Sequence, residues 1–431
     1  MVIWQLFFRF FGGLRRGAVL LCLGAGAGTA LAQPIERAGP FQFVRPKQQR
    51  AVVPYRIERN LPVVRATVNG AGPFNFLLDT GVATALLTVP GLADSLHLTH
   101  GQMFRVVGAG REATGLMAYQ ADGVRVALAG GRVVAPAMTW LVLSEDALNL
   151  SGYMGMPIAG ILGSELFRSF VVRFEPEAGR LCLTAPAAFR APSGRRWARL
   201  PLRLVQNKAY LNLPVCLPDS GVQVLKLVLD TGAGHALSLE TDAVPPRIAV
   251  PTVRLPADLG RGLTGIVRGH LGRVDSLRLG RYQLRAVLTS FPIPNPLALR
   301  LDEPRDGNLG YELLKRFTLI VDYPHRELLL RPNIHFREPF EHDMCGLELR
   351  ASGPDFRRYV AATVAPASEA AKAGIAPDDE LLSINFINVN TLSLTQISRM
   401  LHTADGRLLF LTLRHANGEL YTTLLRLKRQ I

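Results

Sequence analysis

Two segments decide the fold: FNFLLDTG at residues 74–81 and LKLVLDTG at residues 225–232. In each, an apolar run typical of a β-strand leads directly into Asp-Thr-Gly. One such triplet would be weak evidence, because an aspartate that caps a backbone amide at the end of a strand would explain it. Two copies in similar surroundings indicate a duplicated unit, and an internal repeat changes the interpretation of the whole chain.

Landmarks after the two motifs recur at matching distances. A Thr-Gly pair ends 34 positions after the first motif and 33 positions after the second, and another glycine follows 15 positions later in both halves. Further on, Ile161-Leu162-Gly163 and Asn308-Leu309-Gly310 occupy equivalent positions. Each precedes a predicted helical turn, at residues 164–170 and 311–317, and then a strand with a proline-containing turn. The repeat therefore extends well beyond the motifs.

The strands of both halves are short, separated by Gly and Pro, and mostly alternate between apolar and polar residues. This pattern predicts a mainly β protein in which each half is a small, partly closed β-barrel with one short helix. Two similar halves imply a pseudo-twofold axis, which brings equivalent residues face to face. We therefore expect the two Asp-Thr-Gly turns to meet.

Paired carboxylates explain the motif chemically. Two carboxylates about 3 Å apart share one proton, so one can activate water while the other protonates the leaving amine. The glycines let the backbone pass close to the opposite half, and the threonine hydroxyls can hydrogen-bond across the interface. The predicted catalytic residues are Asp79 and Asp230, supported by Thr80, Gly81, Thr231 and Gly232.

With these motifs, residues 51–335 resemble the retropepsin-like and pepsin-like aspartic peptidases, in particular the exported bacterial kind with two lobes in one chain. The resemblance implies that Asp79 and Asp230 hold the attacking water and that a hairpin flap closes over the substrate. Two features depart from the family pattern. Val82-Ala83 follows the first motif where a small residue and then Ser are common, and the second apolar-apolar-Gly begins with Asn308.

Glycine-rich stretches lie at similar offsets after each aspartate. Gly108 and Gly110 in the first half, and Gly260 and Gly262 in the second, are the flap candidates. A hinged lid excludes water from a hydrolytic site. An ordinary hairpin turn explains these glycines equally well.

The character of the chain changes near residue 346. Residues 343–429 resemble the PDZ domains attached to bacterial envelope proteases, on the evidence of the segments 373–379 and 382–385. The resemblance implies an α/β domain that binds a chain terminus beside a backbone carboxylate nest. By position, that nest comprises Gly346, Leu347, Glu348 and Leu349. Family members usually carry Gly where Asp378 and Phe386 stand, so we expect these loops to differ. The alternative is a domain used for packing alone.

The N-terminus has the pattern of a targeting segment. Three arginines precede a short apolar run, and Ala30-Leu31-Ala32 is a small-x-small cleavage site. This pattern predicts a signal peptide at residues 1–32, because the apolar run is shorter than the ~20 residues of a membrane-spanning helix. We therefore expect an exported protein of the periplasm or cell envelope, or a secreted one. The alternative is a membrane anchor.

The net charge of +15 is scattered rather than gathered into a stripe with aromatic residues, which argues against a nucleic-acid partner. A solvated basic surface explains it, and attraction to an anionic envelope surface is the alternative.

Three cysteines remain after the leader, which allows one bridge, with Cys182 and Cys216 as candidates. No motif predicts a metal or another cofactor.

The sequence thus divides into the predicted signal peptide, an N-terminal linker, two protease lobes joined by a basic linker, and a PDZ domain. The predicted bounds are 1–32, 33–50, 51–187, 188–198, 199–335 and 340–431, with the basic linker at 188–198. The predicted function is that of a monomeric aspartic endopeptidase acting on polypeptides, with a PDZ domain for a C-terminal peptide ligand. The alternative is a non-catalytic envelope peptide-binding protein that uses the PDZ domain on a degenerate protease scaffold.

Overall fold

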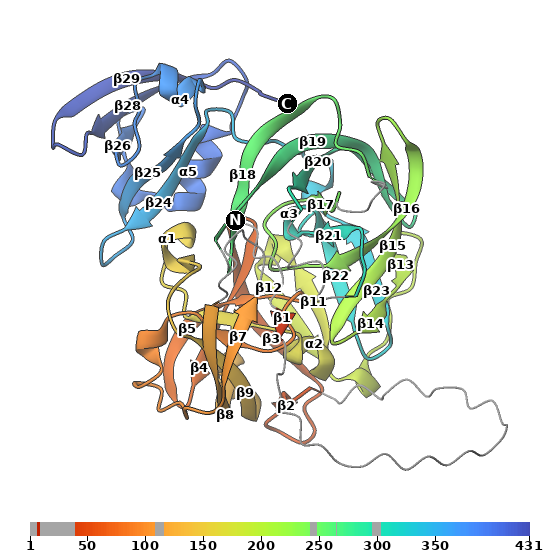
Figure 1. The fold of residues 1–431 in the computed structure, drawn as a ribbon. Helices are drawn as coiled ribbons and strands as arrows, with labels where there is room; N and C mark the ends of the chain where they lie inside the picture. Colours follow the sequence, from red (N-terminus) through yellow and green to blue (C-terminus); the bar gives the residue numbers. More distant parts are fainter. Residues whose placement is uncertain (1–6, 9–38, 108–115, 242–247, 264, 295–302) are drawn as a thin grey trace, which may run out of the picture.

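The computed structural model describes residues 7–8, 39–107, 116–241, 248–263, 265–294 and 303–431. The fold is mainly β, as predicted, with 50% of these described residues in strands and 12% in helices. Figure 1 shows three parts: a first lobe in orange and yellow, a second lobe in green and cyan, and a blue C-terminal domain.

Strands β1–β12 precede the second lobe. They are β1 (Phe7–Phe8), β2 (Gln42–Phe43), β3 (Arg50–Glu58), β4 (Leu61–Val68), β5 (Ala71–Leu78), β6 (Leu86–Leu87), β7 (Met103–Val107), β8 (Leu116–Leu128), β9 (Val133–Leu143), β10 (Gly160–Leu162), β11 (Val171–Glu175) and β12 (Arg180–Thr184). The helices of this part are α1 (Leu150–Met154) and α2 (Glu165–Ser169), with 3₁₀ turns at Pro90–Leu92, Ala129–Gly131, Pro176–Ala178 and Pro186–Ala188.

Strands β13–β23 form the second lobe and its junction with the first. They are β13 (Ala198–Pro201), β14 (Arg203–Val205), β15 (Lys208–Leu217), β16 (Gly221–Leu229), β17 (Leu237–Leu239), β18 (Arg254–Gly262), β19 (Gly265–Leu279), β20 (Tyr282–Pro292), β21 (Gly307–Leu309), β22 (Phe317–Asp322) and β23 (Glu327–Pro332). This part also contains α3 (Tyr311–Leu314) and a 3₁₀ turn at Ile334–Arg337.

The duplication is visible in the strand pairing. In the first lobe, β10 runs parallel to β5, with Ile161 opposite Leu77, and antiparallel to β6. In the second lobe, β21 runs parallel to β16, with Asn308 opposite Val228, and antiparallel to β17. Helices α2 and α3 follow at the two predicted helical turns. Equivalent sequence landmarks therefore occupy equivalent structural positions.

One sheet continues from the first lobe into the second. Strand β11 pairs antiparallel with β22, so that Val172 lies opposite Val321 and Phe174 lies opposite Leu319. Strands β12 and β3 extend this sheet on one side, and β23 and β13 extend it on the other. The two barrels expected from the sequence are thus joined by backbone hydrogen bonds. Their relative position is consequently held by a sheet as well as by side chains.

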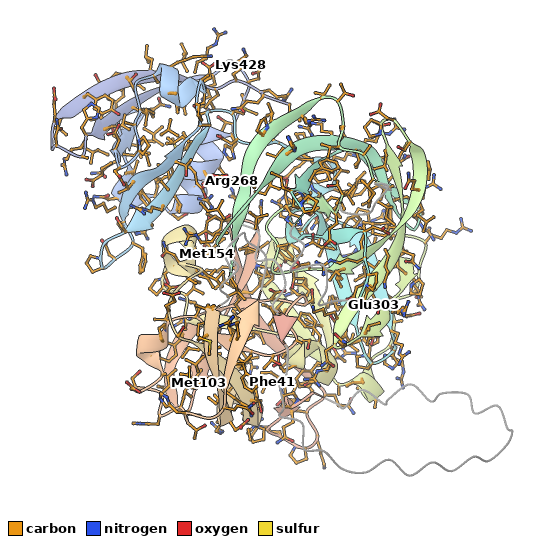
Figure 2. The ribbon with its side chains drawn as sticks, viewed as in Figure 1. Phe41, Met103, Met154, Arg268, Glu303 and Lys428 are labelled. Carbon is orange, nitrogen blue, oxygen red and sulfur yellow. The ribbon has the colours of Figure 1, made fainter. Side chains whose placement is uncertain are left out.

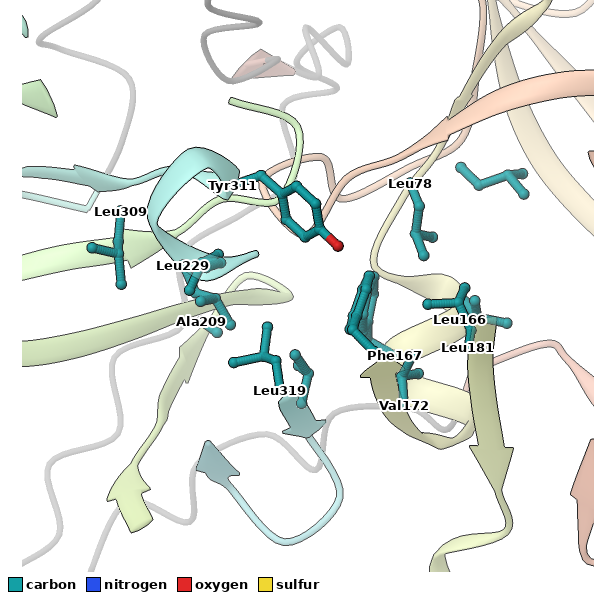
Figure 3. Packing of buried hydrophobic residues seen from close by; sticks show 14 of the residues in the cluster. Leu78, Leu166, Phe167, Val172, Leu181, Ala209, Leu229, Leu309, Tyr311 and Leu319 are labelled. Atoms are coloured by element: carbon teal, nitrogen blue, oxygen red, sulfur yellow. The ribbon is translucent and has the colours of Figure 1, made fainter. Parts of the chain in front are cut away.

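Apolar side chains of both lobes pack together beneath this junction. Figure 3 shows Leu78 and Phe167 of the first lobe beside Leu229, Tyr311 and Leu319 of the second. All five are fully buried. The Tyr311 hydroxyl points to the first lobe, where its oxygen lies 3.0 Å from that of Tyr55. Burial of each such side chain contributes on the order of 1.5–3 kcal/mol, so the two lobes form one unit.

The C-terminal domain has the predicted α/β organisation. Its elements are β24 (Leu347–Ser352), β25 (Arg358–Val364), α4 (Glu369–Lys372), β26 (Glu380–Ile384), β27 (Ile387–Asn388), a 3₁₀ turn at Val389–Thr391, α5 (Leu394–Leu401), β28 (Leu408–Arg414) and β29 (Leu420–Arg426). The sheet order is β24-β25-β26-β28-β29, with β27 beside β26. Strand β24 therefore forms one edge, and α5 packs beside it.

The two loops in which Gly is replaced keep a glycine-like backbone. Asp378 has φ +70° and Phe386 has φ +66°, both in the left-handed region. Both residues thus adopt the left-handed conformation that glycine favours, and the expected difference of these loops from those of family members stays a prediction. A left-handed non-glycine residue costs about 1–2 kcal/mol. Phe386 is 84% exposed and stacks on Phe410 with ring centroids 5.0 Å apart.

Among the described residues, the helices are all too short or too polar to cross a bilayer.

Candidate active site

The two motif aspartates lie at equivalent backbone positions, immediately after β5 and β16. The Asp79 amide donates to the carbonyl oxygen of Leu162 at 2.9 Å, and the Asp230 amide donates to that of Leu309 at 3.0 Å. In each lobe the apolar-apolar-Gly segment thus supports its own aspartate. Both side chains are buried, with 1% and 0% exposure.

The two threonines lock the aspartate loops together. The Thr80 hydroxyl donates to the Leu229 carbonyl at 2.6 Å and accepts from the Thr231 amide at 3.0 Å. In the mirror arrangement, the Thr231 hydroxyl donates to the Leu78 carbonyl at 2.9 Å and accepts from the Thr80 amide at 3.0 Å. These four buried hydrogen bonds all cross between the lobes. The two pairs of bonds are related by the pseudo-twofold axis that the repeat predicts.

The two glycines bring each loop against the opposite aspartate. The Gly81 amide donates to Asp79 Oδ1 at 2.6 Å, and the Gly232 amide donates to Asp230 Oδ1 at 3.1 Å. A β-carbon at Gly232 would overlap the Asp79 carboxyl group, and one at Gly81 would lie 3.1 Å from Asp230 Oδ1. Glycine is therefore required for the two carboxyl groups to approach each other.

The electrostatics of the pair favour a shared proton. Burial raises the pKa of Asp79 well above its usual range, and the neighbouring Asp230 charge raises it further. Burial also raises the pKa of Asp230, to about 6, although a hydrogen bond from Asn308 and the charge of Arg305 oppose this shift. Two adjacent buried carboxyl groups of this kind can supply one acid and one base at the same pH.

Asn308, which the sequence marked only as a departure from the family pattern, is a further residue of the site. Its Nδ2 donates to Asp230 Oδ2 at 2.8 Å, and its Oδ1 lies 3.2 Å from His235 Nε2. The sequence did carry a signal, because Asn308 interrupts an otherwise apolar pattern, but a pattern break does not say what the polar group contacts.

The flap candidates fall into two groups. Gly108 and Gly110 lie outside the described residues. Gly260 and Gly262 lie in β18, in the hairpin with β19. Beyond them, Leu263 is buried in an apolar cluster of the first lobe that includes Leu148 and Leu150. This hairpin therefore crosses from the second lobe to the first, and its role as a lid stays a prediction.

The predicted carboxylate nest lies at the edge of the C-terminal sheet that β24 forms. Gly346 has φ +73°, and Leu347, Glu348 and Leu349 begin the edge strand β24. Helix α1 of the first lobe packs against this strand, as Figure 1 shows. A β-carbon at Gly155, next to Met154 labelled in Figure 2, would lie 2.8 Å from the Leu394 side chain of α5. The first lobe thus contacts both elements that border the nest.

The β3–β4 turn connects this edge to the aspartate loop. Arg59 Nη1 donates to the Leu349 carbonyl of β24 at 3.3 Å, and the Arg59 amide donates to Thr395 Oγ1 of α5 at 3.2 Å. The next residue, Asn60, donates from Nδ2 to the Gly234 carbonyl at 3.3 Å. Gly234 lies two residues beyond the second Asp-Thr-Gly. The side chains of two adjacent residues therefore contact the predicted nest and the loop that follows Asp230.

Cysteine and potential metal-ligating side chains both occur in the part of the chain that the structure describes. That part contains no cluster of three or more His, Cys, Asp or Glu side chains that could hold a metal ion. Cys182, Cys216 and Cys345 are all free thiols, so the candidate bridge between Cys182 and Cys216 is not formed.

Comparisons with known proteins agree with the two kinds of domain. Residues 64–166 match the aspartyl protease family model, and residues 360–415 match the PDZ domain model. No curated protein sequence matches the chain.

Two solved structures show limited similarity. The photosystem II D1 C-terminal processing protease is 27% identical over 19% of this chain, with a TM-score of 0.18. The match spans 22% of that protease's length. Soybean basic 7S globulin is 9% identical over 68% of this chain and 97% of its own, with a TM-score of 0.36. At these TM-scores neither similarity bears on function.

Proposed function

We propose that this chain, which combines an aspartyl protease domain with a C-terminal PDZ domain, is an aspartic endopeptidase. The observation that carries the proposal is the symmetric meeting of two Asp-Thr-Gly loops. Their threonines form four hydrogen bonds between the lobes, and their glycines leave room for two buried carboxyl groups to face each other. A scaffold that only binds peptides has no need for this arrangement.

Hydrolysis then needs no metal and no covalent intermediate. One carboxylate takes a proton from water while the hydroxide equivalent attacks the peptide carbonyl carbon. The protonated carboxyl gives its proton to the carbonyl oxygen, which produces a neutral gem-diol. As the C–N bond breaks, the first carboxyl protonates the amine nitrogen and a gem-diol hydroxyl returns a proton to the second. The products are an amine and a carboxylic acid, and the pair regains its single proton.

The test is cleavage of an unfolded protein by the mature chain between pH 3 and pH 8. Asp79→Asn and Asp230→Asn serve as matched variants, since each removes one ionisable group and keeps the shape. Activity in the parent and none in either variant supports the carboxylate pair. Equal activity in all three points to a contaminating protease, and no activity in the parent refutes the proposal in favour of the peptide-binding alternative.

The PDZ domain is proposed to receive the C-terminus of a polypeptide at Gly346–Leu349. A peptide that adds a strand to β24 needs the carbonyl groups of that edge. Arg59 already occupies the Leu349 carbonyl and α1 packs on the same strand, so peptide binding requires the first lobe to withdraw. Titration of a labelled C-terminal peptide into the Asp79→Asn protein measures this binding without proteolysis.

Export is proposed from the N-terminal pattern, with removal of residues 1–32. N-terminal sequencing of the protein recovered from the periplasm or medium of an expressing bacterium tests it, and a start at Gln33 is expected. Sedimentation of the mature chain tests the predicted monomeric state, which follows because one chain already contains both aspartates.

A further inference from the structure

The two carboxyl groups of the pair have different neighbours. Asp230 Oδ2 accepts a hydrogen bond from Asn308 Nδ2 at 2.8 Å. In the first lobe, the equivalent position is Ile161, which is fully buried and apolar. Accepting a hydrogen bond stabilises the ionised form of a carboxyl group. Asp230 accepts this one from a side chain that the first lobe lacks, so the pseudo-twofold symmetry of the site is broken here.

His235 holds the Asn308 amide in the orientation that this contact needs. Its Nε2 lies 3.2 Å from Asn308 Oδ1, and its Nδ1 is buried with no hydrogen-bond partner among the described residues. Burial lowers the pKa of His235 to about 3, so the ring is neutral and carries one proton. With that proton on Nε2, the ring donates to Oδ1 and Nδ2 faces the aspartate. If the Asn308 amide were reversed, its Oδ1 would face Asp230 Oδ2, and two hydrogen-bond acceptors would repel each other.

Burial raises the pKa of Asp230, as it does that of Asp79, and the charge of Arg305 opposes this shift in the same direction as the Asn308 hydrogen bond. Arg305 lowers the pKa of Asp230, and its Nε is 2.6 Å from Glu240 Oε1 in a largely buried ion pair. Across the interface Asp230 faces Asp79, and its own loop contributes the Gly232 amide. For Asp79, the amides of Gly81 and Gly232 favour the anion, whereas burial and the Asp230 charge oppose it.

We infer that Asn308, oriented by His235, is a positioning residue that makes Asp230 the ionised member of the pair and leaves the shared proton on Asp79. The inference rests on the proposed function and gives each carboxyl group one task. Asp230 takes the proton from the attacking water, and Asp79 delivers its proton to the carbonyl oxygen. When the C–N bond breaks, Asp230 protonates the amine and Asp79 recovers a proton from the gem-diol.

The main variant is Asn308→Leu, which gives the second lobe an apolar residue like Ile161. Loss of one hydrogen bond to a charged group corresponds to an upward shift of about one to two pH units in the pKa of Asp230. The acid limb of the kcat/KM profile should move up by the same amount. His235→Phe, which keeps Asn308 but frees its amide, should produce a smaller shift in the same direction. Thermal melting confirms that each variant folds.

Direct titration separates this inference from the proposed function. Carbon-13 NMR of protein labelled at the aspartate carboxyl groups, assigned with Asp79→Asn and Asp230→Asn, reports the ionisation even in an inactive protein. Asn75→Ala is the matched control, because it removes an amide that donates to the Pro157 carbonyl in an exposed hydrogen bond and contacts neither aspartate. If Asn308→Leu titrates and cleaves as the parent does, the inference is overturned while the proposed function stands. If the titration shifts but the parent never cleaves, the inference about ionisation stands and the proposed function fails.

Discussion

Replacement of Thr231 by Val tests the hydrogen-bonded joint between the lobes. Valine has nearly the shape of threonine, so the change leaves no cavity and removes only the hydroxyl. Two buried groups of the first lobe then lose their partners, namely the Leu78 carbonyl and the Thr80 amide. Each unsatisfied buried group costs about 1–3 kcal/mol, which predicts a loss of about 2–6 kcal/mol in the free energy of unfolding.

Urea unfolding followed by tryptophan fluorescence measures this loss, since Trp140 is fully buried in the first lobe. Thr231→Ser keeps the hydroxyl and should recover most of the stability. By symmetry, Thr80→Val should cost a similar amount, because it leaves the Leu229 carbonyl and the Thr231 amide without partners. A loss below about 0.5 kcal/mol in both valine variants, or equal losses for Val and Ser, would refute the argument, since surface substitutions reach that size.

Three further predictions concern other parts of the molecule. Burial raises the pKa of Glu165 from 4.5 to about 7. The folded protein therefore holds this proton more tightly than the unfolded chain does, and the free energy of unfolding falls as the pH rises from about 4.5 through about 7. Glu165→Gln should therefore lessen the fall in unfolding free energy between pH 5 and pH 8 by up to about 3 kcal/mol, and an unchanged slope contradicts this. Gly232→Ala should abolish cleavage by displacing the Asp79 carboxyl, whereas Gly91→Ala, whose β-carbon would meet nothing within 4 Å, should cleave normally. Arg59→Ala should raise the affinity of the PDZ domain for a C-terminal peptide severalfold by freeing the edge of β24, and calorimetry that finds equal or weaker binding speaks against the proposed competition.

Much of the architecture was predictable because the same sequence landmarks occur in both lobes. Repeated landmarks such as Ile161-Leu162-Gly163 and Asn308-Leu309-Gly310 fix equivalent places in two lobes, and helices α2 and α3 follow them as expected. In the C-terminal domain, the segment Leu394–Leu401 has the apolar spacing of an amphipathic helix and forms α5. Local periodicity was sufficient in these places because the local and the global requirements agree.

Features that depend on contacts between distant residues were not predictable. The pairing of β11 with β22 requires a register between strands about 145 positions apart, which no local pattern encodes. Helix α1 was not predicted, because Gly152 lies inside it and Gly155 ends it, so its helix propensity is low. The contact of Asn308 with Asp230 is likewise a tertiary fact, since Asn is compatible with a turn, a cap or a buried hydrogen bond.

The contacts of the β3–β4 turn imply that peptide binding at the PDZ edge and substrate binding at the aspartate pair are energetically coupled. Arg59 is bound to the PDZ edge and Asn60 to the loop that carries Asp230, so a peptide that removes Arg59 from Leu349 alters the support of that loop. Thermodynamic linkage is reciprocal: whatever factor the peptide applies to substrate binding, the substrate applies to peptide binding. A coupling of about 1 kcal/mol corresponds to about fivefold in each direction. Binding of substrate at the aspartate pair would then change the affinity of the PDZ domain for a peptide, and a product C-terminus bound there would signal that cleavage had occurred.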